Sequence, residues 1–285
     1  MKTKLLITGA YGLVGTAICK LLESYPDIEV TKVKFDDTPN EVESVYDYVI
    51  SGAGYGQPQM FSKDKLACIN INTIEVQKLF RYLKPKGKFL FISTSEVYSG
   101  APSPHKETDI GTTTPQHPRA CYIEGKRCGE AICMAYKEQG FDVKIARLAL
   151  AYGPGTKKGD TRGLNQFIEQ ALTKGEIKLM DKGEAIRTYC YVDDVTQMLL
   201  NILFKGKDVV YNVGGFSKVS ILDLATQIAF ITKTKVTLGN LSLGGAPDSV
   251  ELDMTKTLTE FTMKFTSMSE GLINTINYQR TLYEK

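Results

Sequence analysis

Short apolar runs alternate with amphipathic stretches along the first half of the chain. Residues 3–8 form an apolar run that ends at a glycine, which is typical of a buried strand, and residues 13–24 place leucine and isoleucine near helical spacing. The alternation continues with predicted strands at 28–35, 46–50, 88–92 and 143–150 and predicted helices at 64–83 and 119–138. This order predicts an α/β fold, a doubly wound parallel sheet with helices on both faces.

The pattern changes after Pro154. A polar, glycine-rich loop over 155–163 interrupts the alternation. The elements predicted beyond it are a helix at 163–174, a strand at 177–180 and amphipathic helices at 192–204 and 220–233. These strands are too few for a second large sheet, so the second half is expected to form a smaller lobe.

The same change divides the chain into two expected parts. One is a sheet domain over 1–155, to which residues 191–205 return, and the other is a lobe made of 156–190 and 206–285. Ligands of open parallel sheets bind beyond the carboxyl ends of the strands. The cleft between the two parts is therefore the expected binding site, with the C-terminal lobe holding the substrate.

Three glycines follow the first predicted strand, in the run GAYGLVG from Gly9 to Gly15. The first glycine allows a tight turn, the second lets a pyrophosphate approach the N–H groups of a helix N-terminus, and the third lets strand and helix pack closely. In the first turn between a strand and a helix, they predict a dinucleotide site and a Rossmann-type domain. The predicted cofactor contacts here are Gly9, Tyr11, Gly12, Leu13, Val14 and Gly15.

An acidic residue about 20 positions beyond such a turn contacts the adenosine ribose. Asp36 lies at this distance from Gly15, and an acid there favours NAD over NADP because it repels a 2′-phosphate. The stretch from Gly15 to Ser51 is short, so a second interpretation stays open, in which residues 35–50 contain the acidic turn of the third strand. Further cofactor contacts are predicted after that strand, at Ser51, Gly52 and Ala53.

A tyrosine and a lysine share one face of the predicted helix 119–138, because Tyr122 and Lys126 are four residues apart. A tyrosine hydroxyl has a pKa of about 10 and is a poor base at neutral pH. An ammonium about 4 Å away contributes ~4 kcal/mol at an effective dielectric constant of about 20, which lowers that pKa enough to populate a phenolate. The pair therefore predicts a general base, against the alternative of a surface tyrosine beside a solvated lysine.

Hydroxyl and carboxylate side chains follow the predicted strand 88–92. Thr94 is placed to hydrogen bond a substrate hydroxyl, and Glu96 supplies a second acid or base. The structural alternative is a turn whose hydroxyls cap a helix. Loops at this end of a strand face the cofactor in a doubly wound sheet. The predicted catalytic residues are therefore Thr94, Glu96, Tyr122 and Lys126.

Composition narrows the classes of protein. The chain has 42% hydrophobic and 24% charged residues and a net charge of +3, which argues against disorder and against a nucleic-acid partner. No apolar run approaches the ~18 residues that cross a bilayer, so no membrane partner is expected. Two histidines and six scattered cysteines without a CxxC pair argue against a metal site and indicate reduced thiols in a cytoplasmic protein.

Four runs of sequence resemble a known family: TSEVYS at 94–99, PRACYIEGKRCGE at 118–130, YGPG at 152–155 and IRTYCYVDDV at 186–195. With the G-x-x-G-x-x-G turn they resemble the extended short-chain dehydrogenase/reductases, and among these the UDP-glucuronate decarboxylases, also called UDP-xylose synthases. The resemblance covers most of the chain and implies NAD as cofactor, a nucleotide-sugar substrate and a homodimer. The implied substrate contacts are Ser95, Asn165 and Arg187.

The resemblance implies a reaction that begins at the sugar C4. Tyr122 takes the proton of the 4-hydroxyl while a hydride passes to NAD, and the resulting β-keto acid loses CO₂. Glu96, or a water that it orients, then protonates C5 before the hydride returns. Ser95 stands where 4,6-dehydratases carry an aspartate, and simple 4-epimerases generally lack the glutamate, so decarboxylation is favoured.

Three features depart from the decarboxylase pattern. Leu150 stands in place of a substrate-binding asparagine, Val250 in place of a phosphate-binding arginine, and residues 51–58 lack the family's proline-containing segment. A nucleotide-sugar 4-epimerase or 4-ketoreductase is therefore the alternative enzyme. A non-catalytic dinucleotide-binding scaffold is the alternative outside enzymes, which the retained Tyr122 and Lys126 disfavour.

Overall fold

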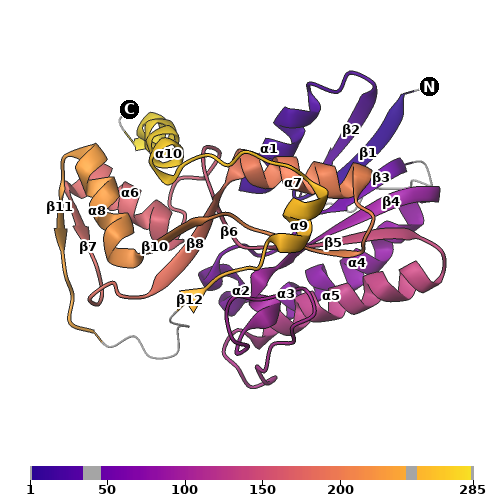
Figure 1. Ribbon diagram of the computed structural model, residues 1–285, viewed down its shortest axis with the longest axis horizontal. Helices are drawn as coiled ribbons and strands as arrows, with labels where there is room; N and C mark the ends of the chain where they lie inside the picture. The colour runs from indigo at the N-terminus through magenta and orange to yellow at the C-terminus, as the bar shows by residue number, and fades with distance from the viewer. Residues whose placement is uncertain (1, 35–45, 242–248, 284–285) are drawn as a thin grey trace.

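A six-stranded parallel sheet forms the larger part of the molecule, in the order β2-β1-β3-β4-β5-β9 (Figure 1). The computed structural model describes residues 2–34, 46–241 and 249–283. The strands of this sheet are β1 (Thr3–Thr8), β2 (Ile28–Val33), β3 (Tyr46–Ser51), β4 (Leu83–Thr94), β5 (Asp142–Leu148) and β9 (Val210–Val213). All pair in parallel, which confirms the predicted Rossmann-type sheet.

Helices cover both faces of the large sheet (Figure 1). On one face lie α1 (Leu13–Leu22) and α7 (Val192–Lys205), and on the other lie α4 (Ile74–Leu79) and α5 (Ala120–Glu138), with α3 (Lys65–Asn72) beside α5. Ile7 and Leu199 are buried in the first layer, and Phe89 and Ile145 in the second. Removing these apolar side chains from water drives the layers together, with α7 packed against the large sheet.

The smaller lobe has its own core, which contains Phe167, Leu224 and Leu272. Its helices are α6 (Gly163–Lys174), α8 (Ile221–Thr232) and α10 (Met268–Tyr283). One sheet joins β6 (Leu150–Tyr152), β8 (Ile186–Tyr191), β10 (Ser217–Ser220) and β12 (Ser249–Val250), and β7 (Glu176–Lys178) pairs with β11 (Lys235–Thr237). The lobe is therefore more strand-rich than its sequence pattern predicts.

The chain passes from one sheet to the other at Ala149, inside the single strand predicted over 143–150. β5 ends at Leu148 in the large sheet, and β6 begins at Leu150 beside β8. A continuous apolar run does not reveal that its two halves join different sheets. Likewise, the predicted helix 64–83 is divided at Thr73 into α3 and α4, followed by a 3₁₀ turn over Phe80–Tyr82.

The boundary of the lobe differs from the expected one. β9 lies within the segment 206–285, yet it pairs with β5 at the edge of the large sheet. Leu252 and Met254, just before α9 (Thr255–Glu260), belong to the core under α1 and α7. Pairing with β9 satisfies the backbone groups that β5 would otherwise expose, so this part of the segment belongs with the sheet domain.

Candidate active site

The glycine turn lies where β1 meets α1. Gly9 has a φ of +70°, and a Cβ at this position would lie 2.4 Å from Gly52 O. A Cβ at Gly15 would lie 2.1 Å from Gly9 O, which is the close strand–helix packing that the third glycine predicts. Gly12 is the N-cap residue of α1, and no cap side chain occupies the first N–H groups of the helix, an arrangement that fits a pyrophosphate.

The carboxyl end of β3 lies against the same turn. Ser51 stands opposite Thr8 in the register of β1 and β3. Thr8 Oγ1 accepts hydrogen bonds of 3.2 Å from the backbone N–H groups of both Gly52 and Ala53. The structure therefore brings the predicted cofactor contacts of the two loops together. Asp36, the predicted ribose contact, lies outside the described residues.

Lys126 lies on the buried side of α5, beneath the loop that follows β3. Its Nζ donates a 2.7 Å hydrogen bond to Ile92 O and lies 4.7 Å from the centre of the Phe91 ring. A Cβ at Gly54 would be 3.7 Å from this Nζ and 3.8 Å from Asn72 Oδ1, an acceptor that is buried without a partner within the described chain. Burial lowers the pKa of Lys126 to about 8.

Tyr122 is half-buried, one turn before Lys126 on α5. Its hydroxyl is hydrogen-bonded to Thr94, and its ring stacks on Phe61 with 5.0 Å between ring centres. Burial raises the pKa of Tyr122, and the Glu96 carboxylate adds to the rise. The prediction that Lys126 lowers the pKa of Tyr122 is therefore contradicted for the chain itself. The reason is that both side chains are desolvated and the ammonium is directed to a backbone carbonyl.

Glu96 is paired with an arginine that the sequence analysis did not select. Glu96 lies in the 3₁₀-helix η2 (Ser95–Tyr98), where its N–H donates a 3.3 Å hydrogen bond to Thr94 Oγ1. Its carboxylate forms an ion pair with Arg119 Nη2, and Arg119 Cζ lies 5.3 Å from the centre of the Phe61 ring. Burial raises the pKa of Glu96, and Arg119 opposes the rise. Arg119 stands three residues before Tyr122, a spacing that brings two helical side chains together, and this was the available signal.

The four predicted catalytic residues therefore meet at the carboxyl end of β4. Thr94 contacts both Tyr122 and the backbone of Glu96, and Lys126 is bonded to the strand two residues before Thr94. The group contains a phenol, a hydroxyl, a carboxyl and an amine, which together can accept, hold and return protons. The structural alternative for Thr94 is also realised, because it caps η2.

The predicted substrate contacts are more scattered. Ser95 begins η2 beside Thr94, and Arg187 lies on β8 in the other sheet. Asn165 is buried in α6, where it accepts a 2.9 Å hydrogen bond from Gln279 Nε2 and is bonded to Asp160. These bonds occupy the Asn165 amide within the lobe, which does not support the predicted substrate contact.

Two loops meet across the boundary between the sheet domain and the lobe. Gln57, in the loop after β3, accepts hydrogen bonds from Thr161 N at 3.2 Å and Oγ1 at 2.9 Å, and its Nε2 donates to Asp160 at 3.3 Å. A Cβ at Gly155 would lie 3.6 Å from Leu13 Cδ1, next to the glycine turn. The start of the polar loop 155–163 therefore lies next to the glycine turn.

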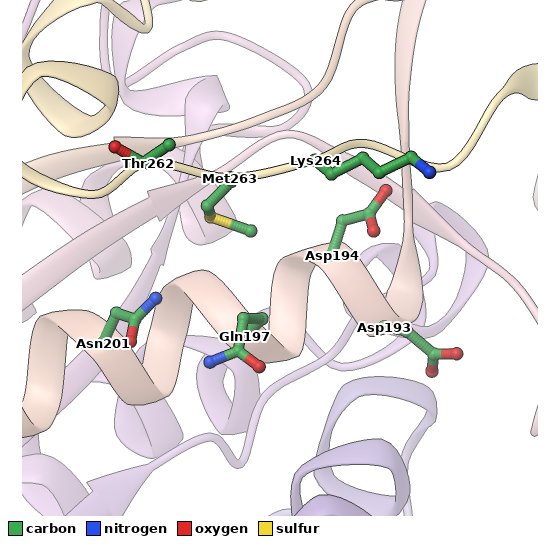
Figure 2. Close-up of a pocket in the computed structure, with 7 residues that line it drawn as sticks. All are labelled: Asp193, Asp194, Gln197, Asn201, Thr262, Met263 and Lys264. Atoms are coloured by element: carbon green, nitrogen blue, oxygen red, sulfur yellow. The ribbon is translucent and has the colours of Figure 1, made fainter.

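A separate hollow lies between α7 and the segment 262–264 (Figure 2). Figure 2 shows its lining side chains, which are Asp193, Asp194, Gln197, Asn201, Thr262, Met263 and Lys264. Asp194 accepts hydrogen bonds from Thr266 N at 2.9 Å and Thr266 Oγ1 at 3.1 Å. Because none of the predicted cofactor or catalytic residues lines it, this hollow is distinct from the candidate active site.

The glycine turn and the tyrosine–lysine pair can be compared with known proteins. The model of the NAD dependent epimerase/dehydratase family matches residues 5–214, more than half of the chain. The chain belongs to this family. NAD, the predicted cofactor, is the cofactor for which this family is named. The N-terminus of α1 at Gly12 fits its pyrophosphate.

The curated relatives of this family member include decarboxylases. UDP-glucuronic acid decarboxylase 1 of Xenopus tropicalis is 29% identical over 252 residues, which cover 80% of this chain and 60% of the relative. UDP-glucuronic acid decarboxylase 6 of Arabidopsis thaliana is 30% identical over 200 residues, which cover 69% of this chain and 57% of the relative. The chain thus spans about 60% of the length of the curated relatives it matches.

Solved structures confirm the fold. The UDP-glucuronic acid 4-epimerase of Bacillus cereus, in complex with UDP-glucuronic acid and NAD, superposes with a TM-score of 0.85 at 24% identity, covering 99% of this chain and 100% of the other. An epimerase of Methanothermobacter thermautotrophicus has a TM-score of 0.86 at 20% identity, covering 99% and 94%. At these identities the likeness concerns the fold alone.

Two further features of the described residues concern metals and membranes. Within the ranges 2–34, 46–241 and 249–283, no group of three or more His, Cys, Asp or Glu side chains is arranged to hold a metal ion. In the same ranges, each helix is too short or too polar to span a bilayer.

Proposed function

We propose that this member of the family oxidises C4 of a nucleotide sugar and decarboxylates a UDP-glucuronate-like substrate. The observation that carries the proposal is the meeting of Thr94, Glu96, Tyr122 and Lys126 beside the glycine turn. The similarity to UDP-glucuronic acid decarboxylases supports the substrate class. When bound, NAD supplies the acceptor that takes a hydride from C4 and later returns it.

Tyr122 is assigned the proton of the sugar 4-hydroxyl. Its bond to Thr94 orients the phenol at the end of β4. Burial and Glu96 raise the pKa of Tyr122, so the phenolate needs positive charge nearby when it forms. Lys126 is the cation on the same helix face, and its pKa of about 8 lets it gain or lose a proton close to neutral pH.

Glu96 is assigned the proton transfer at C5. Loss of CO₂ from a β-keto acid leaves an electron pair that must take up a proton at that carbon. Burial raises the pKa of Glu96, so this carboxyl is a better proton carrier than a solvated glutamate. Its charge raises the pKa of Tyr122, and both residues adjoin Thr94, which supports the assignment of the two groups to one substrate.

A nucleotide-sugar 4-epimerase is the second candidate, and two residues favour it. Leu150 is 39% exposed at the start of β6, and Val250 stands opposite Arg187 in the register of β12 and β8. The resemblance to decarboxylases implies a polar substrate contact at each of these two apolar positions. A site that lacks these polar contacts is expected to hold the sugar less firmly. It therefore also fits an epimerase, in which the keto sugar rotates within the site and keeps its carboxylate.

Incubation of the purified protein with UDP-glucuronate and NAD⁺ tests the proposal. We expect a product that has lost CO₂, seen by mass spectrometry, with no net NADH and with no product from Tyr122→Phe. A product of unchanged mass and inverted C4, seen by NMR, would establish the epimerase instead. Binding of NAD without turnover of a panel of nucleotide sugars would support the scaffold.

We also propose that two copies associate through α3 and α5. These neighbouring helices carry three exposed apolar side chains, Leu66, Ile69 and Met134. Exposed apolar side chains that gather on one face mark an interaction surface. Analytical ultracentrifugation should show a dimer, and Leu66→Glu should shift it to the monomer, whereas Phe230→Glu, at an exposed apolar residue of α8, should not. A monomeric wild type would contradict this assignment.

A further inference from the structure

We propose that Arg119 is a positioning residue that holds Glu96 and Tyr122 in one chain of contacts facing the substrate. This inference rests on the proposed function, because it concerns the two residues assigned to proton transfer. The contacts themselves belong to the chain and can be tested without turnover.

The backbone of Arg119 is fixed one turn before Tyr122. Arg119 is the N-cap residue of α5, and its carbonyl accepts hydrogen bonds from Tyr122 N at 3.0 Å and Ile123 N at 3.1 Å. Its own N–H donates to His117 Nδ1 at 3.2 Å. The base of the arginine side chain therefore moves with the helix that carries the tyrosine.

The side chain of Arg119 contacts both a carboxylate and an aromatic ring. Its Nη2 forms the ion pair with Glu96, and its guanidinium lies over the ring of Phe61. Phe61 is fully buried, and its ring also stacks on that of Tyr122, which is parallel to it within 4°. Thr94 closes the chain of contacts, since it binds the Tyr122 hydroxyl and the Glu96 backbone.

An arginine suits this place because of its shape and charge. A planar guanidinium can stack on an aromatic ring while it holds a carboxylate, which a lysine ammonium cannot do equally well. Within the part of the chain that the structure describes, the charged and titratable groups that act on Glu96 or respond to it are Arg119 and Tyr122, at the N-cap and in the first turn of α5. The cation opposes the rise in pKa of both proton-transfer groups, so one side chain sets their position and their charge.

The first test follows the Glu96 carboxyl by ¹³C NMR as a function of pH, with Glu96→Gln used to assign the signal. In Arg119→Met we expect the apparent pKa of Glu96 to rise by at least about one pH unit, tenfold in the protonation equilibrium. Arg119→Lys should give a smaller rise because it keeps the charge. The matched control is Lys78→Met, which removes an exposed ion pair with Glu75 on α4 and should change nothing.

An unchanged Glu96 titration in folded Arg119→Met would overturn the inference, whatever the substrate proves to be. If Arg119→Met does not fold, the same NMR titration is made on Arg119→Lys. An unchanged apparent pKa of Glu96 in that variant would also contradict the inference. With UDP-glucuronate as substrate, we expect both variants to lower kcat with little change in KM. We also expect the alkaline limb of the kcat/KM profile, which falls as the Glu96 carboxyl loses the proton it gives to C5, to move to higher pH. A uniform loss of rate without that displacement would indicate a merely structural arginine.

Discussion

Arg147→Met tests the buried charge network beneath the candidate active site. Arg147 on β5 and Glu130 on α5 form an ion pair in which the side chains are 13% and 10% exposed. Arg147 also donates 2.9 Å hydrogen bonds to Tyr98 OH and to Glu107 O. Glu130 accepts a 2.5 Å hydrogen bond from Ser93, which directly precedes the last residue of β4. The network therefore supports the strand end at which the catalytic candidates meet.

The expected cost follows from this burial. Methionine is similar in length to the arginine stem but leaves the Glu130 carboxylate without its counter-charge. Breaking a buried pair from one side typically costs about 3–5 kcal/mol, and we expect a loss near the middle of that range in the free energy of unfolding. Replacing both partners, in Arg147→Met with Glu130→Met, removes both charges and should cost much less than the sum of the single variants.

Urea denaturation of the wild type, both single variants and the double variant at one pH measures these costs. The reasoning requires a large coupling energy between Arg147 and Glu130. It is refuted if Arg147→Met costs less than about 1 kcal/mol at an unchanged dependence on urea, since surface ion pairs fall in that range. Strict additivity of the two single variants would refute it equally.

Three further outcomes are expected. Tyr122→Phe should lower turnover at least about 100-fold while calorimetry shows unchanged NAD binding, because only the proton-accepting hydroxyl is lost; retained turnover would contradict its role. Gly15→Ala should lower the free energy of unfolding by about 1–3 kcal/mol and weaken NAD binding, because the new Cβ would lie 2.1 Å from Gly9 O. Gly163→Ala, where a Cβ would have no atom within 4 Å, should leave the thermal unfolding temperature nearly unchanged. Since burial lowers the pKa of Lys126 from 10.5 to about 8, the unfolded state holds the extra proton between these values, so the free energy of unfolding should rise with pH across that window. The rise should be on the order of a few kcal/mol and absent from Lys126→Met, and an identical pH dependence in both proteins would contradict the assignment.

Local patterns predicted many elements closely. The helix expected over 119–138 corresponds to α5, and that over 163–174 corresponds to α6, because apolar spacing marks a helix face and glycines mark its ends. The glycine turn was predictable for the same reason, since a positive φ and close backbone approach leave few other residues possible. The tyrosine–lysine spacing on a helix likewise set which residues share a face.

Other features lie between residues that are distant along the chain. Phe61 and Arg119 form one stack with Tyr122, yet Phe61 comes from α2 (Pro58–Lys63), and no local pattern marks Phe61 as part of the site. The addition of β9 to the edge of the large sheet is of the same kind. Strand pairing depends on which edge is free after the sheet has formed, and no local pattern encodes that.

By itself, the sequence determined the alternation of strands and helices in the first half of the chain, the dinucleotide turn and the four catalytic candidates, because each depends on neighbouring residues and on helical or strand spacing. Only the tertiary structure decided the charge state of the site. The pKa of Tyr122 is raised and that of Lys126 is lowered because packing removes both from water, and Arg119 counters Glu96 because the fold places them together. Desolvation and distant contacts arise only when the layers close.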